Sequence, residues 1–452
     1  MRQFPARRSW AASFLAMSVG LLLTVDAALA LDFSAPLNLS QTPGFSWMGR
    51  VIAADERVYV VWSESGTDWA GVALRESLDR GKTFGQVHFF PGMTPSSRAS
   101  GPMGLSLWAS GPRLYMAWLA HRDETRNEIF FTSYDSLDQA DALPHRLSDG
   151  PHRLGQPLVA LDAQRIYVVW LAESLQSPGQ RVIEVTWSHE KDLVFKKPQG
   201  HLAHLSSSSP SLLMAAEGGV LYLCWSERTK GGEVLRVARS ADQGLTFEQP
   251  ADLATSSESI SPTRLIIEGS TVAVAWLESY RPTGEGGRLH VATSANRGIR
   301  FTKPVQLSAN ARSMVSMAVD ELGSVYAVWI DGGGELPAVV FSRSDDAGKS
   351  FSSPANIFHS RGGLVQFAQF SGDRERLSVV WKAEAPEPGH KSDILYSAST
   401  DRGRTFSPPQ NLSRTAGNST LPAMAVAGSG VYAVWADDTP GNYEIFFTKS
   451  PP

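Results

Sequence analysis

Acidic side chains recur at a constant place in this sequence, two or three residues after a tryptophan that ends a short apolar segment. A carboxylate at such a position can accept hydrogen bonds, pair with a cation or take part in acid–base catalysis. Seven residues form the set: Glu64, Glu173, Glu227, Glu278, Asp331, Glu384 and Asp437.

Arginines form a second set. Arg50 and Arg264 each stand twelve residues before such a tryptophan, and Arg153, Arg312 and Arg361 stand just before or at the start of the preceding apolar segment. Guanidinium groups bind carboxylates and sulfates through bidentate, charge-assisted hydrogen bonds. The two sets predict either a surface that binds an acidic ligand or a network of salt bridges between repeats.

The elements that position these charges belong to an internal repeat. Eight apolar segments end in tryptophan, at Trp62, Trp118, Trp170, Trp225, Trp276, Trp329, Trp381 and Trp435, and the steps between them are 51 to 56 residues. Repeats of this length with turns between short strands are typical of propeller blades. We therefore predict an all-β, eight-bladed β-propeller of four-stranded antiparallel blades, with seven blades as the alternative.

The sixth repeat illustrates the four strands, which we expect over residues 314–320, 325–329, 338–344 and 351–358. The first two are nearly continuous apolar runs, as in strands that are covered on both faces. Because successive strands alternate in direction, the connections that enter a repeat and the loops after the tryptophans share one face. This loop face carries both charged sets, and variable loops on a rigid scaffold commonly hold ligand sites.

Five segments after the expected third strands share a Ser-x-Asp/Asn-x-Gly pattern that ends in Phe: 77–84, 240–247, 294–301, 344–351 and 399–406. They resemble the Asp boxes (BNR repeats) of the sialidase-like β-propeller family, over the whole chain after residue 30. We expect Ser and Asp to bond to backbone, Gly to take a positive φ and Phe to be buried. These structural residues are Ser77, Asp79, Gly81, Phe84, Ser240, Asp242, Gly244, Phe247, Ser344, Asp346, Gly348, Phe351, Ser399, Asp401, Gly403 and Phe406.

For active members, the resemblance implies an arginine triad that holds a sugar carboxylate, a Tyr nucleophile activated by Glu, and an Asp acid/base. Tyr280 and Glu278 are then the candidate catalytic residues. Arg50 would be the first arginine, with Arg153, Arg264 or Arg312 for the others. Arg50 stands in MGRVIAA, without the Phe/Tyr-Arg-Ile-Pro sequence of that family, and the eight repeats replace the family's usual six blades.

The two ends of the chain predict how the ring closes. The eighth repeat ends after its third strand, at 444–450, whereas FSAPLNLS at 33–40 is a near copy of FSPPQNLS at 406–413. We expect the N-terminal segment to supply the missing outer strand of the last blade, which leaves no open sheet edge.

Residues 1–30 have the pattern of a signal peptide, with three arginines before an apolar run and Ala28-Leu-Ala30 as the cleavage site. We expect residues 31–452 to form one exported domain, periplasmic or secreted, without a membrane span. The single cysteine, Cys224, is expected to be buried. The formal charge of −4 disfavours a nucleic-acid partner. No metal-ligand motif or phosphate loop is present, so we predict no cofactor and no metal.

These observations favour a non-catalytic, monomeric binding module for an acidic extracellular glycan or a protein. The first alternative is an exo-acting glycoside hydrolase of sialidase type, which would use Tyr280 and Glu278. The second alternative is a structural platform for protein–protein interaction. Convergence of Arg50 and Arg264 with Tyr280 at the axis would favour the hydrolase.

Overall fold

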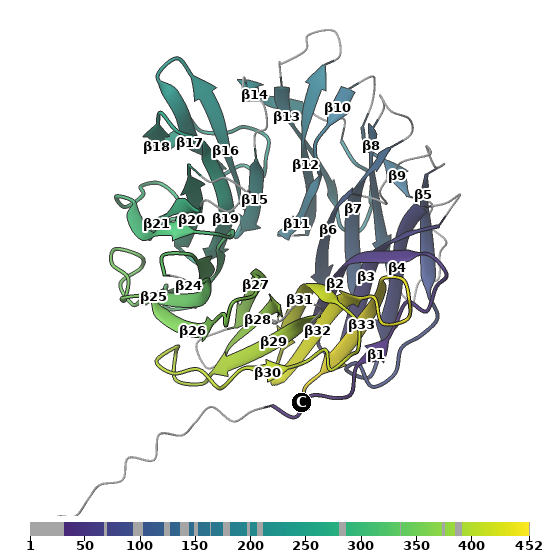
Figure 1. Ribbon diagram of the computed structural model, residues 1–452. Coiled ribbons are helices and arrows are strands. Elements are labelled where there is room, and N and C mark those ends of the chain that lie inside the picture. The colour runs from purple at the N-terminus through teal and green to yellow at the C-terminus, as the bar shows by residue number, and fades with distance from the viewer. Residues whose placement is uncertain are drawn as a thin grey trace, which may run out of the picture.

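The computed structural model consists of β-strands, and the residues that it describes contain no helix (Figure 1). Residues 1–30 and Tyr280 lie outside the described residues. The structure describes residues 31–451 except for 67–69, 94–102, 122–126, 136–143, 149–151, 163, 175–180, 197–198, 206–210, 280–285, 335, 373–375 and 385–390.

The strands follow the tryptophan repeats, which we number as units 1 to 8 in the order of the tryptophans. Units 1 to 4 contain β2 (Phe45–Ala54), β3 (Arg57–Ser65), β4 (Ala70–Ser77), β5 (His88–Met93), β6 (Met103–Ser110), β7 (Arg113–His121), β8 (Asn127–Tyr134), β9 (His145–Arg146), β10 (His152–Leu154), β11 (Leu158–Asp162), β12 (Arg165–Ser174), β13 (Arg181–His189), β14 (Gln199–Leu205), β15 (Leu212–Glu217), β16 (Val220–Thr229), β17 (Gly232–Ser240) and β18 (Ala251–Ser256).

Units 5 to 8 follow the same order, and the last unit takes its outer strand, β1, from the start of the chain. Their strands are β19 (Ile260–Glu268), β20 (Thr271–Glu278), β21 (Gly287–Ser294), β22 (Val305–Ala311), β23 (Ser316–Val319), β24 (Val325–Asp331), β25 (Ala338–Ser344), β26 (Ala355–His359), β27 (Val365–Gly372), β28 (Leu377–Glu384), β29 (Ser392–Ser399), β30 (Gln410–Asn411), β31 (Ser419–Ala427), β32 (Gly430–Asp437), β33 (Glu444–Lys449) and β1 (Leu37–Asn38).

The first strand of unit 6 is shorter than the predicted segment 314–320: it begins at Ser316 and ends before Asp320. Asp320 Oδ1 accepts hydrogen bonds from the backbone N–H of Leu322 at 3.0 Å and of Ser324 at 2.8 Å. The two N–H groups therefore bond to a side chain of their own turn and not to a neighbouring strand. The expected strands are otherwise present in unit 6, with the fourth beginning at Ala355.

The second strand of each unit is buried on both faces. All eight repeat tryptophans are at most 2% exposed. β3 and β16, for example, run through six consecutive buried residues or more. Such double cover requires a neighbouring sheet on each side, as the continuous apolar runs predict.

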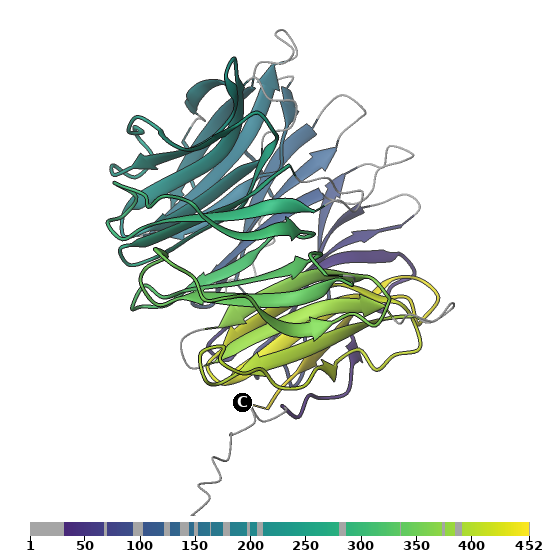
Figure 2. The ribbon, with the colours of Figure 1, turned by 60° about the vertical axis from the view of Figure 1, so that its left-hand side comes forward.

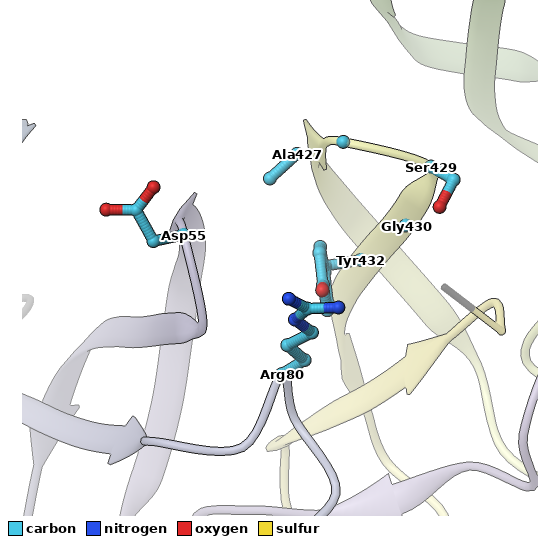
Figure 3. A pocket seen from close by; sticks show the side chains of 7 residues that line it. Asp55, Arg80, Ala427, Ser429, Gly430 and Tyr432 are labelled. Carbon is cyan, nitrogen blue, oxygen red and sulfur yellow. The ribbon is translucent and has the colours of Figure 1, made fainter.

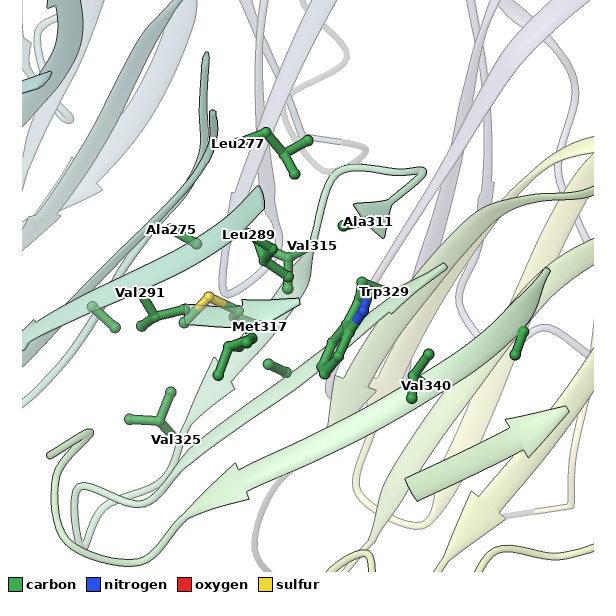
Figure 4. Close-up of a cluster of buried hydrophobic side chains, with 14 residues drawn as sticks. Ala275, Leu277, Leu289, Val291, Ala311, Val315, Met317, Val325, Trp329 and Val340 are labelled. Carbon is green, nitrogen blue, oxygen red and sulfur yellow. The ribbon is translucent and has the colours of Figure 1, made fainter. Parts of the chain in front are cut away.

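Eight clusters of buried hydrophobic side chains supply that cover, one between each two neighbouring units. Figure 4 shows the cluster between units 5 and 6, where Trp329 and Val325 lie opposite Leu289 and Val291 of the preceding unit. Burying these side chains between sheets removes apolar area from water on both faces of every sheet. The interfaces between units are therefore the core of the molecule.

The sheets stand around a common centre (Figures 1 and 2). Their first strands contact one another in a closed circle, in the order β2, β6, β11, β15, β19, β23, β27, β31 and again β2. Hydrogen bonding groups the described strands into seven sheets, because the pair Ala311–Asp331 joins units 5 and 6 into one. The predicted all-β, antiparallel propeller architecture is confirmed, whereas the hydrogen bonds alone do not confirm the count of eight blades.

The predicted closure is also confirmed, since β1 pairs antiparallel with β33 (Figure 1). Leu37 faces Phe447 in the register, and the backbone N–H of Leu39 donates to the carbonyl of Ile445 at 2.7 Å. Leu39 is fully buried and Phe33 is 4% exposed. The N-terminal segment therefore adds side chains to the core in addition to its backbone hydrogen bonds with β33.

The Asp-box segments make the bonds that their sequence predicts. In the segment 344–351, Ser344 donates to Asp346 Oδ1 at 2.7 Å, and Ser350 donates to Asp346 through both its backbone N–H and its hydroxyl. Gly348 has φ 81°. Hydrogen bonds from Ser350, reinforced by those from Ser344 and Lys349 and opposed by burial, lower the pKa of Asp346 to about 2.

The box also joins neighbouring units, which the sequence does not indicate. The residue before the box glycine has a positive φ and presents its carbonyl to a donor of the preceding unit. These bonds are Tyr222 Oη to Arg297 O (2.8 Å), Thr293 Oγ1 to Ala347 O (2.6 Å), Arg343 Nη1 to Arg402 O (2.8 Å) and Lys449 Nζ to Arg80 O (2.9 Å). The boxes therefore stabilise the face opposite the loop face.

Candidate functional site

The recurrent carboxylates lie at the loop-face end of the second strands, and two of them are buried. Glu64 accepts hydrogen bonds from Thr42 (2.7 Å), Ser46 (2.6 Å) and the indole of Trp62 (2.6 Å). Asp437 accepts from Thr415 and Ser419, each at 2.6 Å, and from Thr439. Both networks tie the segment that enters a unit to its second strand.

Three further carboxylates are paired with cations. Glu173 accepts from Arg181 at 3.1 Å and Glu227 from Arg236 at 2.5 Å, across neighbouring strands of one sheet. Glu384 pairs with Lys382 at 2.9 Å. These side chains are held within their own units.

Asp331 accepts hydrogen bonds from Ser308, from the indole of Trp329 at 2.8 Å and from the backbone of Gly333 at 2.7 Å. Ser308 lies on β22 of the preceding unit, so this bond crosses an interface.

Glu278, the candidate catalytic carboxylate, has three partners. Ser256 donates a hydrogen bond to it, Arg288 lies 3.1 Å away and His290 Nε2 lies 3.3 Å away. Burial raises the pKa of Glu278, but the hydrogen bonds from Ser256 and Arg288, with the charges of Arg288 and His290, outweigh burial. The pKa therefore lies below the ordinary value of a glutamate. Tyr280, its expected partner, falls outside the described residues.

Arg153, Arg312 and Arg361 are exposed at the loop face. Arg153 faces Glu173 in the register of β10 and β12. Arg312 packs against Gly332, where an added Cβ would lie 2.1 Å from Nε of the arginine.

Arg50 and Arg264 differ from all of these. Both belong to first strands, β2 and β19, which lie four steps apart in either direction around the circle of inner strands. Neither makes an ion pair with any residue that the structure describes, and Arg50 donates only to the carbonyl of Gly49, at 3.2 Å. Both are exposed, yet burial lowers the pKa of each guanidinium.

We call Arg50 and Arg264 the axial arginines. The structure places the strands that carry them on opposite sides of the circle of first strands. The recurrent carboxylates are held in hydrogen bonds and ion pairs, whereas the axial arginines have no carboxylate partner among the described residues.

A pocket of about 290 Å³ lies on the opposite face, between units 8 and 1. Arg80 and Tyr432 lie side by side in it, and Asp55 stands on the other side of the opening (Figure 3). Sequence reasoning did not find it, because its lining comes from turns that are far apart in the chain. It is remote from the predicted charged sets.

Among the described residues, no three His, Cys, Asp or Glu side chains are grouped as metal ligands would be. None of the described segments is a helix that is long and apolar enough to cross a membrane.

No protein-family model matches the sequence, and no curated protein matches it. Among solved structures, the chain is similar to an ulvan lyase described as a new family of polysaccharide lyase, at 10% identity and a TM-score of 0.51, over 82% of this chain and 95% of that chain. It is also similar to a mutant of the NanB sialidase from Streptococcus pneumoniae, at 10% identity and a TM-score of 0.40, over 92% and 71% of the two chains.

A third similar structure is a protein of unknown function from Dyadobacter fermentans, at 14% identity and a TM-score of 0.42, over 93% of this chain and 99% of that chain. At such low identities a likeness concerns the fold alone. What the site does must be argued from its own residues.

Proposed function

We propose that the chain is an exported, sialidase-like β-propeller that acts as a non-catalytic binding module, and that the axial arginines bind an acidic group of an extracellular glycan or protein. The proposal rests on a difference between the recurrent carboxylates and the axial arginines in the residues that they bond to. All seven recurrent carboxylates have donors, whereas Arg50 and Arg264 have no carboxylate among the described residues.

The electrostatics support an anionic ligand. A guanidinium that is partly desolvated and unpaired has lost hydration without regaining a charge partner. A ligand carboxylate or sulfate supplies that partner through charge-assisted hydrogen bonds, which are stronger where the guanidinium is desolvated.

The surroundings of Glu278 favour binding over hydrolysis. A carboxylate that activates a tyrosine must accept the phenolic proton, and a raised pKa makes it better at this task. Glu278 instead has a lowered pKa and three partners already. The hydrolase would require it to give up bonds that stabilise its charged form.

The test is an array of sialylated, sulfated, uronic-acid and neutral glycans together with acidic peptides, read for retained protein and for loss of terminal sugar. The mature chain should be retained by acidic ligands without sugar loss. The variants Arg50→Gln and Arg264→Gln should weaken retention, each by about tenfold or more, since a hydrogen bond to a charged group contributes ~1.5–3 kcal/mol.

Arg300→Gln is the matched control, because Arg300 is exposed on the opposite face and its removal changes the net charge equally. If all three variants lose retention equally, the effect depends on net charge alone and the proposal is overturned. Release of terminal sialic acid by the unmodified chain would establish the hydrolase instead.

A further inference from the structure

The first strands share an irregularity near the loop face. β2, β6, β27 and β31 each have a β-bulge over the residues fourteen and thirteen positions before the tryptophan of their unit, and β19 has one at the thirteenth position. Bulges re-aim side chains and are frequent beside functional sites.

In three of these strands the bulge residue is a bulky apolar one with a positive φ: Met48 at 55°, Phe367 at 55° and Leu421 at 51°. In β6 the same place is taken by Gly104, with φ 71°. Glycine adopts this conformation without strain, whereas a large side chain does so at a cost. Strain of this kind persists mainly where the side chain has a task. Phe367 is 42% exposed, and Met48 and Leu421 are partly exposed.

Met314 of unit 6 is not at a bulge position: it stands fifteen residues before Trp329, one residue further from its tryptophan than Phe367 is from Trp381, and it is 64% exposed. We call Met48, Met314, Phe367 and Leu421 the apolar rim. Its members come from four consecutive units, 6, 7, 8 and 1, whose first strands contact one another in turn.

The axial arginines bracket this rim. Arg264 lies on β19 of unit 5, next to the unit of Met314, and Arg50 follows Met48 by two residues on β2. Two residues of strand correspond to about 6–7 Å, so Arg50 lies deeper in the ring than Met48. One half of the ring therefore offers an apolar arc with a guanidinium at each end that has no ion pair within the described part of the chain.

The residue types of the rim favour one kind of ligand. Two methionines and a leucine are flexible aliphatic side chains that adapt to apolar side chains of a partner, as Met-rich binding surfaces do. A ligand that satisfies both the rim and the arginines must carry an apolar group within one or two residues of an anion. The C-terminal residue of a peptide carries both, its side chain and its α-carboxylate.

Resting on the proposed function, we propose that the axial arginines and the apolar rim capture the C-terminal end of an extracellular protein whose last residue is apolar. The α-carboxylate pairs with Arg50, and the last side chain packs on Phe367 and Leu421. A chain end brings its carboxylate past the rim with backbone on one side only, whereas a carboxylate in mid-chain brings backbone on both sides.

The test uses the mature chain and synthetic peptides that end in Leu or Ser, each with a free or an amidated C-terminus. The free Leu-ending peptide should bind best, and both the amide and the Ser ending should weaken binding by about tenfold, the effect of one charged hydrogen bond or one buried side chain. In the Arg50→Gln variant, peptides with a free and an amidated C-terminus should bind with equal affinity. In the Phe367→Gly variant, peptides that end in Leu and in Ser should bind with equal affinity.

Glycine takes the φ of 55° at this position without strain. The melting temperature of the Phe367→Gly variant should therefore stay close to that of the parent chain, so that a loss of binding is not caused by unfolding. Leu245→Ala is the control, since Leu245 is 50% exposed on the opposite face. Equal binding of acid and amide would overturn the inference. If acidic glycans bind in an Arg50-dependent way while no peptide binds, the inference fails and the proposed function stands. If neither class binds, both fail.

Discussion

Two of the Asp-box glycines, Gly348 and Gly403, lie very close to side chains of the preceding unit, and a substitution at Gly403 tests this packing. Gly403 has φ 74°, and a Cβ added there would lie 2.2 Å from Cε1 of Phe341 in the preceding unit. Phe341 is 1% exposed and packs edge-to-face on Phe406 at 5.1 Å between ring centroids, so it has no room to withdraw.

We expect Gly403→Ala to lower stability through two effects. Alanine at a positive φ costs about 1 kcal/mol, and overpacking against Phe341 costs a further ~1–3 kcal/mol. The entropy of unfolding of a chain this size is roughly 0.9 kcal/mol per degree, so the melting temperature should fall by roughly 2–4 °C.

Gly428→Ala is the matched control. Gly428 also has a positive φ, 55°, but an added Cβ would have no atom within 4 Å. Its melting temperature should fall by roughly 1 °C. Thermal unfolding followed by circular dichroism measures both variants, and equal shifts would refute the role of the box glycine in docking one unit on the next.

Two further changes test the fold. Asp346→Asn should destabilise the chain at neutral pH. The pKa of Asp346 is about 2 in the folded chain and about 3.9 in the unfolded chain. The difference in stability between the variant and the parent chain should therefore shrink as the pH falls from about 4 to 2. A gap that does not depend on pH would count against the bonds described for this carboxylate. Deleting residues 31–40 removes β1 with the buried Phe33 and Leu39 and should cost roughly 3–6 kcal/mol, seen as a lower melting temperature and as aggregation through the exposed edge of β33. An unchanged melting temperature would contradict closure by the N-terminal segment.

Much of the architecture could be predicted from the sequence, because it is encoded locally. The apolar runs that end in tryptophan predict strands buried on both faces, and these tryptophans are indeed buried. The near identity of residues 33–40 with residues 406–413 predicts the pairing of β1 with β33. Each of these predictions needs only a short pattern and its repetition.

The partners of the charged residues could not be predicted, because they lie across strands or across units. Arg181 and Arg236, which pair with Glu173 and Glu227, are on third strands, and no spacing in the sequence marks them as partners. The tie of Asp331 to Ser308 likewise depends on how two units dock.

The apolar rim was missed because a bulge with a positive φ leaves no local signal at Met, Phe or Leu. A regularity does exist: Met48, Phe367 and Leu421 each stand fourteen residues before the tryptophan of their unit, as does Gly104. Aligning the repeats on the tryptophan would have placed these residues together, but only the structure shows that they are strained and partly exposed.

The most direct test of the central claim is to observe the axial arginines while an acidic ligand binds. The Nε–H resonances of Arg50 and Arg264 can be assigned by loss of signal in Arg50→Gln and Arg264→Gln, and followed during titration with a ligand retained on the array. We predict that at least the Arg50 resonance shifts in a saturable way, with the same midpoint as binding, while that of Arg300 does not move. Binding that leaves both axial resonances unchanged would contradict the assignment of the site to these residues.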